Sequence, residues 1–65
     1  KVYPNPSEGL IWIESDNSFK LQIIDILGKE IKSLDSPKML TLPLGFYFFK
    51  FQIGEVVVTE KVVVL

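Results

Sequence analysis

The chain of 65 residues contains no cysteine, no histidine, no arginine and no alanine. Without cysteine no disulfide can stabilise the fold, and without cysteine or histidine the usual ligands of a structural zinc site are missing. A domain of this size buries only about 60% of the surface that its unfolded chain exposes, so we expect modest stability. The core must therefore come from aliphatic and aromatic side chains alone, and 48% of the residues are hydrophobic.

The charges and the hydrophobic runs exclude two classes of partner. The net charge is −1, and the seven basic residues, all lysines, are scattered along the chain, so we expect no binding of nucleic acid. No apolar run approaches the roughly 20 residues of a transmembrane helix, so we expect no membrane insertion. The sequence begins at Lys1 without an initiator methionine or a signal peptide. We expect 1–65 to be one domain of a longer protein whose remainder precedes residue 1.

The kind of hydrophobic residue indicates the fold class. The chain has seven valines, seven isoleucines and five phenylalanines. Branched and aromatic side chains fit a pleated sheet, and they lose rotamer freedom in a helix. The composition therefore predicts an all-β protein.

Turn-forming residues divide the chain into short segments with strand-like patterns. We expect an extended segment over 2–9 and strands over 10–14, 19–26, 30–33, 39–42, 46–53 and 56–65, with a loop over 34–38. Short strands at intervals of about 8–12 residues are typical of a sandwich or a barrel. A helix over 21–32 is the local alternative, but Gly28 lies inside it and its apolar residues fit a period of 3.6 poorly.

The alternation of side chains along each strand predicts which face is buried. In segment 46–53, Tyr47, Phe49 and Phe51 share one face, while the other face carries two phenylalanines and two polar residues. In segment 10–14, one face holds Trp12 and the other holds Ile13, and the pattern does not choose between them. The predicted core consists of either Trp12 or Ile13 together with Leu21, Ile23, Tyr47, Phe49 and Val62.

The last segment, 56–65, is apolar on both of its faces. A strand with one face on the core and the other in solvent would instead alternate apolar and polar residues. It could be a central strand covered on both sides, or it could contain a bulge near Thr59 and Glu60 that switches its faces. We favour a third interpretation, in which it lies at a sheet edge and contacts a partner by strand addition, either another protein or another copy of the domain.

Three polar motifs have a structural interpretation. Asp25 can accept hydrogen bonds from turn N–H groups while Gly28 adopts a positive φ, and a lone carboxylate without a second acid or a base cannot run acid–base chemistry. Asp16 and Asn17 supply too few oxygens for a calcium site, which needs 6–8. Lys61 is a solvated side chain or a charge that protects an edge, and the functional alternative is a charge that a receptor recognises. We therefore expect no catalytic residue, no metal and no cofactor.

The order of the motifs resembles the C-terminal sorting domain of the type IX, or Por, secretion system of Bacteroidetes-type bacteria. A Tyr-Pro-Asn-Pro start is followed by a glycine before the first strand, then Asp-Ile-Leu-Gly-Lys, Leu-Pro-Leu-Gly-Phe-Tyr-Phe and a late lysine. The resemblance covers essentially the whole chain, although the wholly apolar end departs from members that finish with Lys or Arg. The matching positions, which are the candidate recognition residues, are Pro4, Asn5, Pro6, Gly9, Asp25, Gly28, Lys29, Gly45, Tyr47 and Lys61.

This resemblance implies a small Ig-like antiparallel β-sandwich of about seven strands that has no catalysis of its own. It implies that the domain directs an upstream cargo from the periplasm through the type IX outer-membrane translocon. A sortase-like peptidase of the same system then usually removes the domain, and the cargo is attached to the cell surface. The alternative from another class is an Ig-like carbohydrate-binding, adhesion or spacer module. That alternative predicts exposed aromatics, so the burial of Trp12, Tyr47, Phe46 and Phe48 distinguishes the two.

Overall fold

A computed structural model describes all residues from 1 to 65 and contains seven strands and no helix. The all-β prediction is therefore confirmed, and the helix alternative over 21–32 is wrong. The strand bounds are β1 (Val2–Tyr3), β2 (Leu10–Ile13), β3 (Lys20–Asp25), β4 (Glu30–Asp35), β5 (Met39–Thr41), β6 (Gly45–Ile53) and β7 (Val56–Val64).

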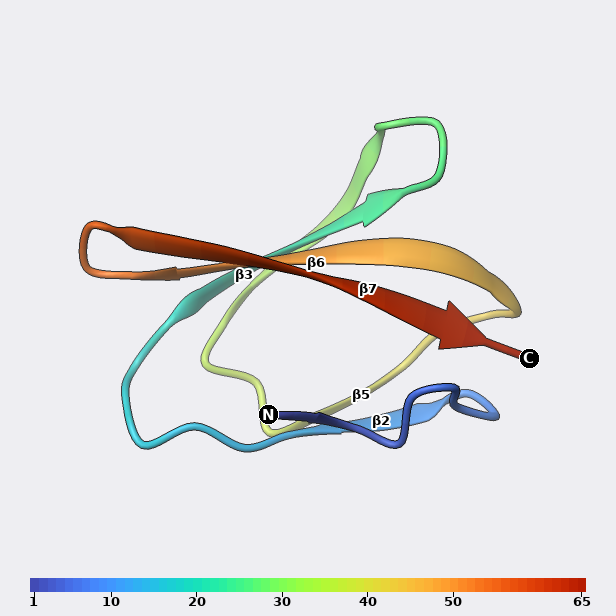
Figure 1. The fold of residues 1–65 in the computed structure, drawn as a ribbon, viewed down its shortest axis with the longest axis horizontal. Coiled ribbons are helices and arrows are strands. Elements are labelled where there is room, and N and C mark those ends of the chain that lie inside the picture. The colour runs from blue at the N-terminus through green and yellow to red at the C-terminus, as the bar shows by residue number, and fades with distance from the viewer.

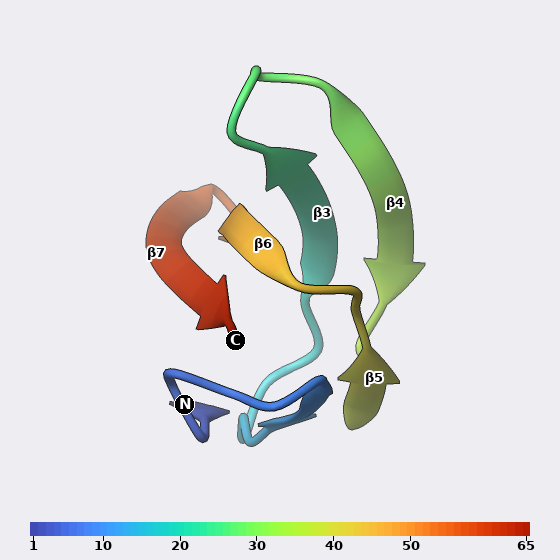
Figure 2. The ribbon, with the colours of Figure 1, turned by 90° about the vertical axis from the view of Figure 1, so that its right-hand side faces the viewer.

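The strands form two antiparallel sheets that face each other as a sandwich (Figure 2). The small sheet has the order β1-β2-β5, and the large sheet has the order β4-β3-β6-β7. In the lettering of immunoglobulin domains, β1, β2 and β5 correspond to strands A, B and E, while β3, β6 and β7 correspond to C, F and G. The structure is thus a small Ig-like β-sandwich.

The core lies between the two sheets and contains the predicted residues. Leu21, Ile23, Phe49 and Val62 are fully buried, and Tyr47 is 6% exposed. The open choice in β2 is settled in favour of the isoleucine face, because Ile13 is buried whereas Trp12 is 42% exposed. Further buried hydrophobic residues complete this core, namely Val2, Ile11, Phe19, Leu40, Leu42, Phe51 and Val64.

The predicted loop over 34–38 is too long at its start. Strand β4 continues for two residues beyond Ser33, because Leu34 pairs with Leu21 and packs against the core. The chain leaves the sheet at Ser36, which has a φ of 45°. The backbone N–H of Phe19 donates to the Ser36 hydroxyl over 3.0 Å, which holds this turn against the start of β3.

Strand β7 is the edge of the large sheet, as predicted. Its pairing with β6 runs without interruption from Gly45 and Val64 to Ile53 and Val56, so the alternative of a face-switching bulge is wrong. The central-strand alternative is wrong as well. The nine-residue strands β6 and β7 extend beyond the short strands of the facing sheet (Figure 1). The second half of β7 is therefore buried at Val62 and Val64, while its first half is exposed.

Candidate recognition site at one end of the sandwich

The ten candidate residues come from four separate segments, and the fold brings these segments together. Asp25 is opposite Tyr47 in the large sheet, and Gly45 is opposite Val64. Ser7, next to Pro6, forms a bridge to the other side of Val64. In Figure 1 the three turns that carry the motifs and the C-terminus lie at the same end of the molecule, on the right. We call this region the motif end.

The Pro-Asn-Pro segment lies along the outer edge of β7, rather than only leading into a strand. The Asn5 side chain donates from Nδ2 to the carbonyl of Lys61 over 2.8 Å and accepts the N–H of Val63 at Oδ1 over 3.0 Å. Its amide thus bonds to β7 as a neighbouring strand would. Pro4 and Pro6 flank this amide and are exposed, so they shape the segment without entering the core.

Ser7 continues the same contact, and the sequence did not single it out. Its N–H donates to Val63 and its carbonyl accepts the N–H of Leu65, both over 2.8 Å. The side chain is 1% exposed, and its hydroxyl donates to the Leu10 carbonyl and accepts the N–H of Gly9. The sequence feature that could have indicated Ser7 is its position two residues before Gly9, a spacing typical of a turn in which a serine hydroxyl accepts a backbone N–H.

Asp25 is a turn former, as its structural interpretation predicted. One carboxylate oxygen, Oδ1, accepts the N–H groups of Leu27 and Lys29, each over 2.9 Å. Gly28 has a φ of 86°, and a Cβ there would meet no atom within 4 Å. Glycine is therefore favoured here by the backbone conformation and not by lack of space. Lys29 follows the turn and is exposed.

Tyr47 links the start of β6 to the turn before it. Its hydroxyl donates to the carbonyl of Pro43 over 2.7 Å. A tyrosine at the start of strand F that bonds to the backbone a few residues upstream is the tyrosine corner of Ig-like domains. Gly45 makes room for this ring, because a Cβ at that position would lie 3.3 Å from the tyrosine hydroxyl.

The motif residues thus build the end of the sandwich, and exposed apolar side chains form much of its surface. Leu27 is 90% exposed in the β3–β4 turn, Leu44 is 79% exposed before β6, and Leu65 is 69% exposed. The Lys61 ammonium lies 5.7 Å from the centroid of the Phe46 ring, within cation–π range. A surface of large apolar residues with one cation is suited to contact with another protein.

The aromatic residues do not form a single platform. Tyr47 is buried, whereas Phe46 and Phe48 are partly exposed on the outer face of the large sheet. Trp12 is exposed on the outer face of the small sheet, opposite Tyr3 in the strand register. A shallow hollow beside this pair is lined by Pro4, Pro6, Glu8, Leu10 and Trp12.

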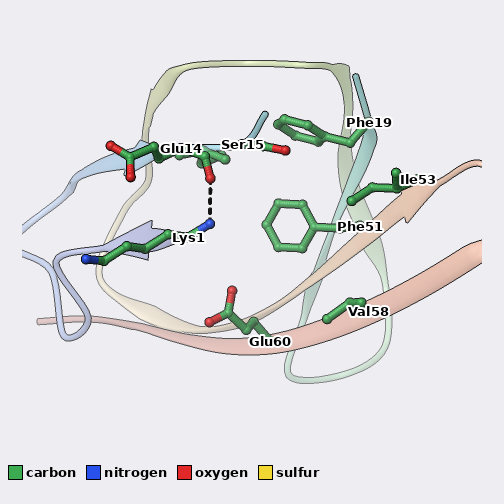
Figure 3. Close-up of a pocket in the computed structure, with 9 residues that line it drawn as sticks. Lys1, Glu14, Ser15, Phe19, Phe51, Ile53, Val58 and Glu60 are labelled. Carbon is green, nitrogen blue, oxygen red and sulfur yellow. Dashed lines mark hydrogen bonds between the residues drawn. The ribbon is translucent and has the colours of Figure 1, made fainter. Parts of the chain in front are cut away.

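A small apolar cleft opens between the sheets at the other end of the molecule (Figure 3). Its volume is about 150 Å³, and Phe19, Phe51 and Val58 line it, with Lys1 and Glu60 at its border. No group of three or more carboxylate, imidazole or thiol side chains that could hold a metal ion is present. The structure likewise contains no helix that is long and apolar enough to span a bilayer.

Comparison of the chain with known protein families identifies the family to which it belongs. The family of secretion system C-terminal sorting domains matches residues 1–65, and the chain belongs to that family. No curated protein matches the chain. Membership makes the domain a C-terminal sorting signal for type IX secretion, in a family that is not catalytic. It implies interaction with the type IX secretion system and a cargo protein that is secreted or placed on the cell surface.

Proposed function

We propose that residues 1–65 are a non-catalytic folded signal that follows an upstream cargo and directs it from the periplasm through the type IX outer-membrane translocon. A sortase-like peptidase of the same system then removes the domain, and the cargo is attached to the cell surface. The match of the family over residues 1–65 is the observation that carries this proposal.

The structure supports a signal that the secretion machinery recognises in its folded form. Asn5 and Ser7 bind β7 residues that are more than 50 positions later in the chain. Tyr47 meets Asp25 only through the pairing of β3 with β6, and Gly45 meets Val64 only through the pairing of β6 with β7. The candidate recognition residues therefore share one surface only when the chain is folded, and we propose that the motif end is the surface that the secretion machinery reads.

Deletion of 56–65 tests the proposal. The truncated chain loses β7, two buried valines, and the partners of Asn5 and Ser7. A reporter that carries a signal peptide and the truncated domain should remain in the periplasm of a host with the type IX machinery. Export of this fusion at the yield of the full domain would refute the proposal for this segment.

A pair of surface variants separates recognition from folding. Leu44→Lys changes an exposed residue at the motif end, and Val56→Lys makes the same kind of change at the other end, where the side chain is 60% exposed. Neither should alter stability by more than about 0.5 kcal/mol. We expect severalfold lower export for Leu44→Lys alone. Equal export of both variants would place the recognised surface elsewhere.

A carbohydrate-binding module is the second candidate, because Trp12 and Tyr3 are adjacent and exposed beside the Glu8 carboxylate. Such a pair offers two aromatic faces on which sugar rings could stack. The chain has one tryptophan, so its fluorescence reports directly on this surface. A saturable change on titration with cell-surface oligosaccharides, lost in Tyr3→Ala, would support this function.

A further inference from the structure

Only half of the outer edge of β7 is occupied. The carbonyl of Lys61, both backbone groups of Val63 and the N–H of Leu65 point away from β6 and bind Asn5 or Ser7. Because a strand alternates with a period of two and this register is unbroken, the backbone groups of Val57 and Thr59 point the same way. No segment of the chain lies along them.

This free stretch carries few of the devices that protect sheet edges. It contains no proline and no bulge, and Val56, Val57 and Val58 are 60%, 49% and 48% exposed. Exposed edges of this kind are templates for pairing with another strand. The charges that interrupt the valines are Glu60 and Lys61, at the border of the occupied half.

We propose that the free half of β7 pairs with the same segment of a second copy of this chain. The two β7 strands run antiparallel about a twofold axis at Val58, and the two large sheets join edge to edge. Val57 of each copy exchanges two backbone hydrogen bonds with Thr59 of the other. This pairing satisfies the four free N–H groups and the four free C=O groups at these two positions of the two copies.

The occupied half of the edge excludes the two registers that are shifted toward the C-terminus. A twofold axis at Thr59 would place Val57 opposite Lys61, whose carbonyl already accepts from Asn5. An axis at Glu60 would set two carboxylates against each other and would require Val63, which Asn5 and Ser7 already bind. The axis at Val58 uses only groups that are free.

The side chains agree with this register. The two Val58 side chains meet as a close cross-strand pair, with Cβ atoms about 4.5–5.5 Å apart. Val58 also lines the apolar cleft between the sheets (Figure 3), so the second copy extends that apolar surface. On either side Val56 lies opposite Glu60, and beyond this pair the oppositely charged side chains of Lys61 and Glu55 lie opposite each other.

Sedimentation equilibrium of the 65-residue chain tests the proposal with two matched variants. The interface is small, so the mass should rise from 7.4 kDa toward twice that value as the concentration approaches about 1 mM. Val58→Lys places two ammonium groups against each other at the axis and should remain monomeric. Val56→Lys places a lysine opposite Glu60 and should dimerise at least as well as the unchanged chain. Circular dichroism checks that both variants are folded.

Single cysteines then test the register, because the chain has none of its own. Val58→Cys should form a disulfide-linked dimer under mild oxidation. The two Val58 residues form a cross-strand pair without backbone hydrogen bonds, and the Cα atoms of such a pair are about 4.5 Å apart. Thr59→Cys should form a disulfide far more slowly, because Thr59 of one copy lies opposite Val57, and not Thr59, of the other. A chain that stays monomeric at about 1 mM would overturn the proposal. So would a dimer that survives Val58→Lys, or faster linkage at position 59.

Discussion

The side chain of Asn5 connects the first and last parts of the chain, and its removal is a direct test of how the motif end is built. Asn5 makes two hydrogen bonds to β7, to the Lys61 carbonyl over 2.8 Å and from the Val63 N–H over 3.0 Å. Asn5→Ala removes both bonds and leaves the two backbone groups to solvent. We therefore expect lower stability and a loosened contact between 4–7 and β7.

The size of the effect follows from the number and exposure of these bonds. A typical protein hydrogen bond contributes about 0.5–1.5 kcal/mol net, and both bonds are exposed, so we expect a loss of about 1–2 kcal/mol. A domain of 65 residues has a total stability on the order of 3–10 kcal/mol. Each kcal/mol lowers Tm by about 4–8 °C in a domain of this size, which gives a fall of about 5–15 °C.

Thermal and urea unfolding measure the effect, and hydrogen exchange locates it. The amide of Val63 should exchange faster in Asn5→Ala, because its acceptor has been removed. Asn5→Asp keeps the acceptor Oδ1 but places a carboxylate oxygen against the Lys61 carbonyl. The Asn5→Asp variant should therefore be less stable than the unchanged chain, but its Val63 amide should exchange more slowly than in Asn5→Ala. Asn17→Ala is the matched control, since Asn17 is exposed and only its backbone atoms form hydrogen bonds.

Equal unfolding temperatures for Asn5→Ala and Asn17→Ala would contradict a stabilising role of the Asn5 amide. Unchanged exchange of the Val63 amide in Asn5→Ala would contradict it as well. Either result would mean that the Pro-Asn-Pro segment is held by its prolines and Ser7, and that its amide adds nothing to the edge.

Three further predictions concern the core, the corner and the edge. Phe49→Ala removes a fully buried ring and should cost about 3–5 kcal/mol, enough to unfold much of the protein; an unchanged Tm would contradict the assigned core. Tyr47→Phe loses the bond to the Pro43 carbonyl and should cost about 1 kcal/mol in urea unfolding, whereas Tyr3→Phe, at a half-exposed ring, should cost nothing measurable. In dilute solution the amides of Val57 and Thr59 should exchange faster than those of β6, and slower exchange there would contradict a free edge.

The fold was largely predictable because it depends on local patterns. Alternation assigned Tyr47, Phe49 and Phe51 to the buried face of β6, and glycine or proline marked most of the turns. The choice between Trp12 and Ile13 could not be made from the sequence, since both faces of β2 are apolar. Ile13 is buried because the large sheet covers that face, which is a property of the sandwich and not of the strand. The longer β4 likewise follows from Leu34, which reaches the core from beyond the expected end.

The candidate site was predictable in its residues but not in its arrangement. Asp25 and Gly28 follow local turn chemistry, so their roles could be read from neighbouring residues. The bonds of Asn5 and Ser7 to β7 join positions more than 50 residues apart, and no local pattern indicates them. Ser7 was missed for this reason, since its burial depends on the edge of β7. The half-occupied edge is visible only once the first and last segments are seen together.

We expect residues 1–65, once folded, to be sufficient to send a cargo through the type IX system. The most direct measurement places a signal peptide and a reporter before residues 1–65 and compares surface and culture-medium reporter with that in the periplasm. In a host with the machinery, we expect the reporter outside the cell with the domain and in the periplasm without it. In a host that lacks the translocon, both fusions should stay in the periplasm. Equal retention of the reporter with and without the domain in the competent host would show that the domain is not a sufficient export signal.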